Sequence, residues 1–240
     1  DEDMMRYVML MGGIAKDFCF DTPEFMAKHA EITKFVKEKK DGDIDTPDIR
    51  HLKTLIRQGE ARTACNYIGV KPENVHFLNL PFYETGTIKK GDLTEVDRDI
   101  VKDLLEKIKP DQIFVAGDLA DPHGTHRVCL DAVLAAIDDI KDEEWMKNCR
   151  IWMYRGAWAE WEIDHIEMAV PISPEELRQK RNSILKHQSQ MESAPFLGDD
   201  ERLFWQRAED RNKATADLYT SLGLASYEAI EAFVEYHPLR

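Results

Sequence analysis

The sequence has few cysteines, fewer basic than acidic residues, and no long apolar run. Four cysteines among 240 residues, with no Cys-x-x-Cys pair, are too sparse for a disulfide scaffold and favour a reducing, cytoplasmic location. The Lys and Arg residues number 32 against 46 Asp and Glu, and the net charge of −14 argues against a nucleic-acid-binding protein. The longest apolar runs, such as residues 132–137, are too short to cross a bilayer, so no membrane partner is predicted.

Several catalytic signatures are also absent. The sequence contains no Walker A loop, no His-Glu-x-x-His pair and no Gly-x-Ser-x-Gly elbow, which excludes the commonest P-loop nucleotidases, zincins and serine hydrolases. Residues 11–13 are no dinucleotide fingerprint, because they follow a predicted helix over residues 3–11 rather than a strand. With 43% hydrophobic and 32% charged residues, the composition is that of a globular protein.

The start of the sequence is unusual. It opens on Asp1 with no initiator methionine and none of the basic and apolar segments of a secretory signal. We therefore expect that the natural N-terminus lies upstream, either because a larger protein was cut or because preceding residues are missing. The length itself allows one ordinary core and no more than two domains.

The first sixty residues are predicted to be helical. Thr22-Pro23-Glu24 and Thr46-Pro47-Asp48 are typical helix starts, because each places an N-cap threonine before a proline at the first helical position. The second of these helices is predicted to end near Gly69, a residue suited to a C-cap.

From residue 75 onward, strands and helices are predicted to alternate. Strands are predicted at residues 75–80, 112–117, 151–154 and 165–170, and helices at residues 94–109 and 123–140. Ser173-Pro174-Glu175-Glu176 begins another helix, and the last seventy residues are predicted to be mostly helical. This alternation predicts an α/β fold with a parallel sheet and helices on both faces.

The richest polar segment follows the predicted strand at residues 112–117. Ligands of open α/β sheets bind beyond the carboxyl ends of the strands, and residues 117–127 occupy that place. His123 and His126 are three residues apart, so on a first helical turn they point to the same side and can bind a metal or transfer protons. Alternatively, Asp121 caps the helix and both histidines are polar surface residues. The spacing does not decide between the two.

Two further positions leave alternatives open. Trp158 and Trp161 lie in a predicted loop between strands, where they either form a wall for sugar stacking or, the favoured interpretation, pack over the sheet. His187 lies near a predicted helix end, where it either interacts with the helix dipole or lines a pocket.

Several segments, taken in order from about residue 49 to residue 233, resemble the PIG-L/LmbE family of metal-dependent N-deacetylases. The clearest are residues 56–62, similar to the family's R-x-x-E-A helix; residues 123–126, similar to its second metal motif H-x-x-H; and residues 186–190, similar to its H-x-S-Q helix. Weaker similarities are found at residues 68–70, 75–81, 109–115 and 228–233. The helical lead-in and residues 82–86 more narrowly resemble the C-terminal part of bacterial two-domain proteins that join a glucosamine-6-phosphate deaminase-like domain to a PIG-L-like one.

The resemblance implies a fold and a domain arrangement. The expected fold is Rossmann-like and LmbE-like, with a parallel sheet flanked by helices, a helical N-terminal lead-in and a helical C-terminus. Residues 1–240 would form a single domain that lacks its first strand, with a lead-in over residues 1–60 and an α/β body over residues 61–240. The family's first metal motif, His-Pro-Asp-Asp, which supplies the catalytic base and two metal ligands, is absent from this sequence.

The resemblance also implies a function for the parent protein: a zinc-dependent hydrolase that removes the N-acyl group from an amino sugar such as an N-acetylglucosamine derivative. It makes His126 a metal ligand and His123 the catalytic residue that steadies the oxyanion or protonates the leaving amine. We expect zinc in the complete domain and weak or no zinc binding in this fragment. The residues expected to bind substrate are Arg57, Asp121, Trp158 and His187.

The expected partners follow from the same comparison. They are an amino-sugar or phosphosugar substrate, a fused N-terminal sugar-phosphate deaminase domain and, in a homo-oligomer, further copies of the chain. An alternative function of a different class is a non-catalytic or regulatory partner domain of a glucosamine-6-phosphate deaminase-like protein. The residues preceding Asp1 would discriminate the two, because the first metal motif upstream would favour the enzyme.

Overall fold

The computed structural model describes residues 11–18, 22–40, 42–83, 91–117, 124–157, 159–191 and 201–238. Contacts between residues divide the chain into two compact units. Unit 1 comprises Asp1–Asn79, Tyr83–Gly91 and Lys186–Ser189, and unit 2 comprises Leu80–Phe82, Asp92–Leu185 and Gln190–Arg240. The single domain expected over residues 1–240 stays a prediction. Within the described residues, no helix combines the length and the apolar character that crossing a membrane requires.

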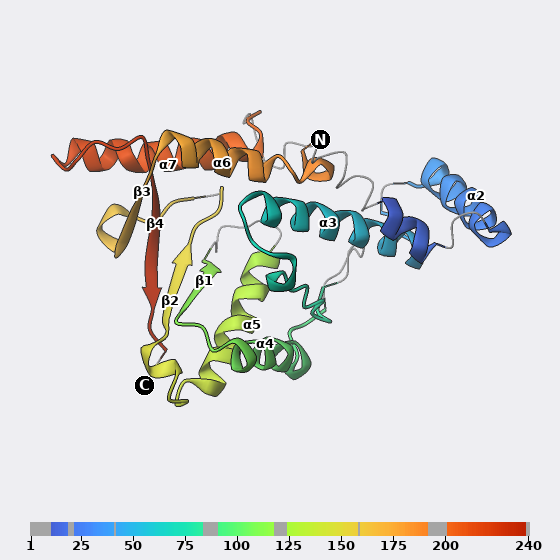
Figure 1. Ribbon diagram of the computed structural model, residues 1–240, viewed down its shortest axis with the longest axis horizontal. Helices are drawn as coiled ribbons and strands as arrows, with labels where there is room; N and C mark the ends of the chain where they lie inside the picture. Colours follow the sequence, from blue (N-terminus) through green and yellow to red (C-terminus); the bar gives the residue numbers. More distant parts are fainter. Residues whose placement is uncertain are drawn as a thin grey trace. The chain divides into compact units, whose positions relative to one another are not determined.

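Unit 1 is built on two long helices, α2 (Pro23–Glu38) and α3 (Pro47–Tyr67), followed by the short 3-10 helix η1 (Pro72–Asn74) (Figure 1). Both long helices begin where the sequence predicts. The hydroxyl of Thr22 accepts a hydrogen bond from the backbone N–H of Phe25 at 3.2 Å, and the hydroxyl of Thr46 accepts one from that of Ile49 at 3.5 Å. The helix predicted over residues 3–11 lies outside the described residues except for its last position.

The C-terminal end of α3 also confirms its prediction. Gly69 follows the helix with a φ of 87°, a left-handed conformation that glycine adopts without steric cost. The strand predicted at residues 75–80, in contrast, is wrong: this segment forms no ladder. Asn79 has a φ of 48°, which interrupts an extended conformation, and its side-chain oxygen accepts a hydrogen bond from the amide of Gln58 on α3 at 3.2 Å.

Unit 2 contains the sheet and the remaining helices. The longer helices are α4 (Glu95–Ile108), α5 (Thr125–Ile140), α6 (Pro174–Ile184) and α7 (Phe204–Ser221). The strands are β1 (Gln112–Ala116), β2 (Arg150–Tyr154), β3 (Met168–Ile172) and β4 (Ala229–Tyr236). The short 3-10 helices are η2 (Met146–Asn148), η3 (Ile163–His165) and, shared between the units, η4 (Gln188–Gln190).

The sheet is mixed rather than parallel, which corrects part of the predicted fold. Its strand order is β1-β2-β4-β3, and the α/β class is confirmed. The pair β1 and β2 is parallel, whereas β4 runs antiparallel to both β2 and β3. Figure 1 shows the opposed arrows of β2 and β4. The prediction of a parallel sheet failed because it did not include β4, which lies between β2 and β3 and runs antiparallel to both.

Strand β4 lies in the segment that was predicted to be helical. Its alanines and glutamates are good helix formers, and that local preference misled the prediction. The structure overrides it because β4 pairs on both sides and buries Ala229, Ile230 and Ala232 almost completely. A partial signal for the strand existed, since the apolar residues Ile230, Ala232, Val234 and Tyr236 recur at every second position and two of the three residues between them are glutamates.

The apolar core of unit 2 lies between the parallel strand pair and α5. It is formed by the buried side chains Ile113, Val115, Leu130, Ile137, Ile140, Met146 and Ile151. Helices α4 and α5 pack against each other beside β1, and α6 and α7 pack beside β3 and β4 (Figure 1). The buried side chains of the parallel pair therefore pack against α5.

The start of α4 is fixed by a buried carboxylate. Asp97 is fully buried, and its carboxylate accepts hydrogen bonds from the N–H of Phe82 at 2.9 Å, the N–H of Thr94 at 2.9 Å and the hydroxyl of Thr94 at 2.7 Å. Burial opposes ionisation of this carboxyl, but the hydrogen bonds outweigh it and lower the pKa of Asp97.

Replacing Asp97 with asparagine is expected to lower the free energy of unfolding at neutral pH by about 1–3 kcal/mol, because a charged acceptor of several hydrogen bonds is lost. A carboxyl with a lowered pKa stabilises the fold above its unfolded pKa of about 4, and that contribution disappears as the pH falls through its folded pKa. The difference between the two proteins should therefore shrink on acidification. Urea unfolding at neutral pH and at about pH 3 measures it.

The matched control for this prediction is Asp99→Asn on the same helix. The Asp99 side chain is 60% exposed, so its replacement should change stability little at either pH. An Asp97→Asn deficit that is equally large at both pH values would contradict the role given to the Asp97 charge.

Candidate functional site

The carboxyl ends of β1 and β2 meet at one edge of the sheet. Ala116 pairs with Tyr154 at the last register position, and the N–H of Gly117 donates a hydrogen bond to the carbonyl oxygen of Tyr154 at 2.7 Å. This edge is where open α/β sheets bind ligands. The connection that follows, residues 118–123, lies outside the described residues, and with it the candidates Asp121 and His123.

His126 is placed on the first turn of α5, directly beyond this edge. The helix begins at Thr125, two residues later than predicted, and Gly124 precedes it with a φ of 67°. The His126 side chain is exposed. An exposed imidazole at the start of a helix that follows a parallel strand is suited to bind a metal or a substrate, and the expected role of His126 as a metal ligand stays a prediction.

Trp161 packs over the sheet, as the favoured interpretation of the tryptophan loop expects. Its indole N–H donates a hydrogen bond to the carbonyl oxygen of Met153 at 3.2 Å. The ring also explains the glycine at position 117, because a Cβ there would lie 3.0 Å from an indole carbon of Trp161 and 2.9 Å from the Cβ of Met153. Trp158, the candidate for substrate binding, lies outside the described residues.

Arg155 is the first residue after β2, and its guanidinium carbon lies 4.0 Å from the centroid of the Trp161 ring. Stacking of this kind is favourable and holds the planar guanidinium in one orientation. Sequence reasoning missed Arg155, although its position directly after a predicted strand and in the tryptophan loop was a usable signal.

The same loop is fastened to α7 through Glu160. Its carboxylate accepts hydrogen bonds from the N–H of Trp161 at 2.9 Å, a guanidinium N–H of Arg211 at 2.5 Å and the hydroxyl of Thr215 at 3.2 Å. Arg211 also donates to the carboxylate of Glu231 on β4 at 2.6 Å. One arginine, only 8% exposed, thus joins a loop, a helix and a strand.

The network continues on the other side of Glu231. This carboxylate forms an ion pair with Lys180 of α6 and accepts a hydrogen bond from the amide of Asn212 at 3.1 Å. Lys180 in turn donates to the side-chain oxygen of Asn212 at 2.7 Å. Four charged groups from α6, α7, β4 and the loop therefore meet in a largely buried position.

Burial and pairing act on these charges in opposite directions. Burial raises the pKa of Glu160 in spite of its pairing with Arg211, and burial also lowers the pKa of Lys180. At Glu231, burial is outweighed by the charges of Arg211 and Lys180, which lower the pKa of that carboxyl. This network positions the loop that carries Arg155 and Trp161, and sequence reasoning missed it entirely because its members are far apart in the chain.

The remaining candidates, Arg57 and His187, both belong to unit 1. Arg57 lies on the exposed side of α3 and donates a hydrogen bond to the hydroxyl of Tyr83 at 3.3 Å. His187 is half-buried and immediately precedes η4. The structure joins the two segments: the carboxylate of Glu60, three residues after Arg57, accepts hydrogen bonds at 2.7 Å from both the N–H and the hydroxyl of Ser189. The expected roles of Arg57 and His187 in binding substrate stay predictions.

The described residues do not by themselves fit a catalytic zinc site. A catalytic zinc needs about three protein ligands. No group of three or more His, Cys, Asp or Glu side chains that could hold a metal ion is found in the described ranges, which leave out residues 118–123. His126 is the one described residue that the family resemblance expects as a ligand, and no reaction step is assigned to a metal here.

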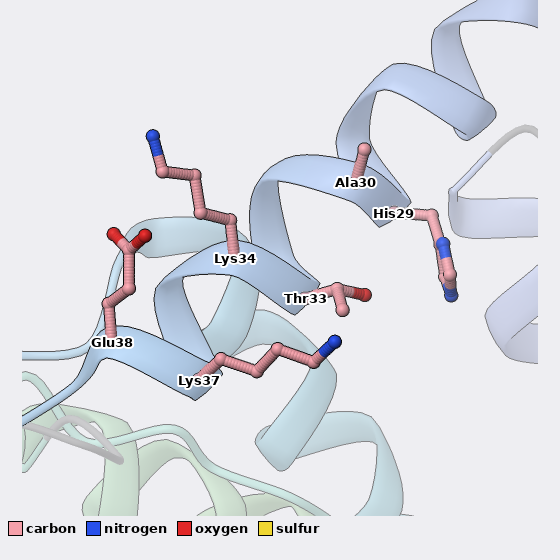
Figure 2. Close-up of a pocket in the computed structure, with 6 residues that line it drawn as sticks. All are labelled: His29, Ala30, Thr33, Lys34, Lys37 and Glu38. Carbon is pink, nitrogen blue, oxygen red and sulfur yellow. The ribbon is translucent and has the colours of Figure 1, made fainter.

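One open hollow of about 380 Å³ lies on α2 and is shown in Figure 2. All of its lining residues come from this single helix: His29, Ala30, Thr33, Lys34, Lys37 and Glu38. Figure 2 shows the side chains of Lys34 and Lys37 pointing in different directions rather than toward a common point. A site that binds a small molecule needs converging polar groups in a concave pocket, so this hollow is no candidate.

Comparison with protein families finds a match over part of the chain. Residues 28–137 match the model of the family described as PIG-L: GlcNAc-PI de-N-acetylase. The matched range contains the R-x-x-E-A-like part of α3, strand β1 and His126. Residues 28–137 are therefore similar to the PIG-L family, and the resemblance drawn from the motifs is confirmed over this range.

Among curated proteins, a protein of Bacteroides thetaiotaomicron described as glucosamine-6-phosphate deaminase-like is 66% identical over 244 aligned positions. The alignment covers 100% of this chain but 36% of that protein, so the chain spans about a third of its relative's length. Among solved structures, the crystal structure of the conserved protein TT1542 from Thermus thermophilus is 18% identical. That match covers 83% of this chain and 78% of the Thermus chain, and it has a TM-score of 0.49.

Proposed function

We propose that the full-length protein containing this chain is an N-deacetylase that hydrolyses the N-acyl group of an amino sugar. The observation that supports this most directly is the PIG-L match over residues 28–137, which includes His126 on the first turn of α5. That turn lies beyond the carboxyl end of a parallel strand, the place where this fold class binds its ligands.

In this proposal His126 is a zinc ligand and His123 carries the proton chemistry. A zinc ion held by His126 together with ligands outside the described residues would supply Lewis-acid chemistry, a lowered pKa of bound water and a polarised acyl carbonyl. The imidazole of His123 steadies the developing oxyanion or protonates the leaving amine. Arg57, Asp121, Trp158 and His187 are proposed to contact the sugar, and the remaining zinc ligands come from outside the described residues.

The proposal is tested by supplying the zinc-loaded full-length protein with N-acetylglucosamine and its 6-phosphate, and by measuring released acetate and ammonia separately. We expect acetate, because hydrolysis of the amide frees it, and we expect no acetate from the His126→Ala protein. If no acetate forms from any N-acylated amino sugar while the protein is folded and zinc-loaded, the proposal fails.

A second candidate function is favoured by the description of the Bacteroides relative. In that case this chain is a partner domain, retained for assembly or regulation beside a deaminase-like part of the same protein. Supplying glucosamine 6-phosphate, whose amine is free, distinguishes the two. Release of ammonia from it, unchanged in the His126→Ala protein, together with no acetate from the N-acetylated sugars, would support the partner domain.

A further inference from the structure

We propose that Arg155 recognises an anionic group, a phosphate or a carboxylate, on the sugar that binds at the carboxyl ends of β1 and β2. This inference rests on the proposed function, because it assigns a chemical class to the same substrate. It makes Arg155 a residue that determines specificity and takes no part in the hydrolysis itself.

The position of Arg155 is the first argument. It directly follows β2, and its sequence neighbour Tyr154 accepts the hydrogen bond from Gly117 that extends the β1–β2 pair by one residue. The chain then passes from Gly117 through the connection that leads to α5 and His126. Arg155 therefore lies at the same edge of the sheet as the start of the segment expected to carry the chemistry.

The second argument is that the guanidinium is held in place before any ligand binds. Its carbon lies 4.0 Å from the centroid of the Trp161 ring. The ring is fixed by its hydrogen bond to the carbonyl oxygen of Met153 at 3.2 Å, and it packs so closely on Gly117 that a Cβ there would lie 3.0 Å away. Stacking uses the face of a guanidinium and leaves the N–H donors at its edge in one plane.

The third argument is the fastening of the whole loop. Glu160 accepts a hydrogen bond from the N–H of its neighbour Trp161 and is bound by Arg211 of α7 at 2.5 Å. The loop is thus attached at the sheet through Trp161 and at α7 through Glu160. A side chain ordered in advance loses little conformational entropy on binding, which is the usual property of a recognition residue.

Charge is the fourth argument. The chain carries a net charge of −14, which repels an anionic ligand unless a local cation attracts it. The flat set of donors of an arginine guanidinium matches the oxygens of a phosphate or a carboxylate in a bidentate way. An arginine placed at the ligand-binding edge of an acidic chain therefore favours an anionic substrate.

The test measures binding to the full-length protein with turnover removed by His126→Ala, so that its outcome does not depend on whether acetate is released. The titrated sugars are N-acetylglucosamine, N-acetylglucosamine 6-phosphate and N-acetylmuramic acid, which carry no anion, a phosphate and a carboxylate. Adding Arg155→Met is expected to weaken the binding of at least one anionic sugar by about 10- to 100-fold and to leave N-acetylglucosamine unchanged. The sugar that loses affinity identifies the anion.

Arg150→Met is the matched control. Arg150 also stacks on a tryptophan, since its guanidinium carbon lies 4.3 Å from the centroid of the Trp152 ring, but it is at the opposite end of β2. The control substitution should change no affinity. Arg155→Lys keeps the charge and is expected to give an intermediate loss, which provides a second measurement should the methionine variant fold poorly. Equal weakening of all three sugars, or no weakening of either anionic sugar, would overturn the proposal. Acetate release tests the proposed function separately.

Discussion

Replacing His126 with alanine in the full-length protein is expected to remove both the bound zinc and the deacetylase activity. The reason is that a catalytic zinc site has about three protein ligands, so the loss of one disables it. Replacing His123 with alanine is expected to leave the zinc content near normal and to lower kcat by about 100- to 10,000-fold, the usual contribution of general acid–base catalysis. Elemental analysis and single-substrate kinetics on an N-acetylglucosamine derivative measure the two effects.

Two results would contradict this division of roles. Equal loss of zinc in both variants would make the two histidines co-ligands. Full activity in both variants would mean that Asp121 caps the helix and that both histidines are polar surface residues. The partner-domain function would then be favoured. If the histidines only occupy the surface, each substitution should change stability by no more than about 0.5 kcal/mol.

Replacing Arg211 with methionine is expected to lower the free energy of unfolding of the 240-residue chain by about 3–5 kcal/mol. The substitution leaves the carboxylates of Glu160 and Glu231 without the guanidinium that binds both of them at 2.5 and 2.6 Å. Their side chains are 17% and 16% exposed, so water replaces the lost partner poorly. Urea unfolding at neutral pH measures the loss.

Two further variants sharpen this prediction. Arg178→Met removes an exposed arginine that pairs with Glu175 on the same helix, and it should change stability little. Adding Glu160→Gln to Arg211→Met is expected to recover part of the loss, because Glu160 loses its ion pair with Arg211 whereas Glu231 keeps its ion pair with Lys180. A loss for Arg211→Met no larger than for Arg178→Met, or no recovery in the double variant, would contradict the role of Arg211 as the centre of the network.

The helix starts were readable in the sequence because they depend on local chemistry. Thr22, Thr46 and Ser173 each precede a proline, and each side chain accepts a hydrogen bond from a backbone N–H three residues ahead. Strands β1 and β2 were equally readable, because they are short, rich in branched and aromatic residues and bounded by turn residues. The histidine motif at residues 123–126 could also be placed from the sequence. It follows a predicted buried strand, so its position beyond the carboxyl end of that strand is predicted without information about distant segments.

What only the tertiary structure decided depends on partners far apart in the chain. Strand β4 has the residues of a helix, and it becomes a strand because β2 and β3 both offer it hydrogen bonds. The loop that carries Arg155 and Trp161 gains its position from Arg211, which is 51 residues away from Glu160. No short window of sequence contains both ends of such a contact, so its presence is settled by the packing of the whole unit. A capping threonine and the backbone N–H that donates to it, in contrast, always lie within one helical turn.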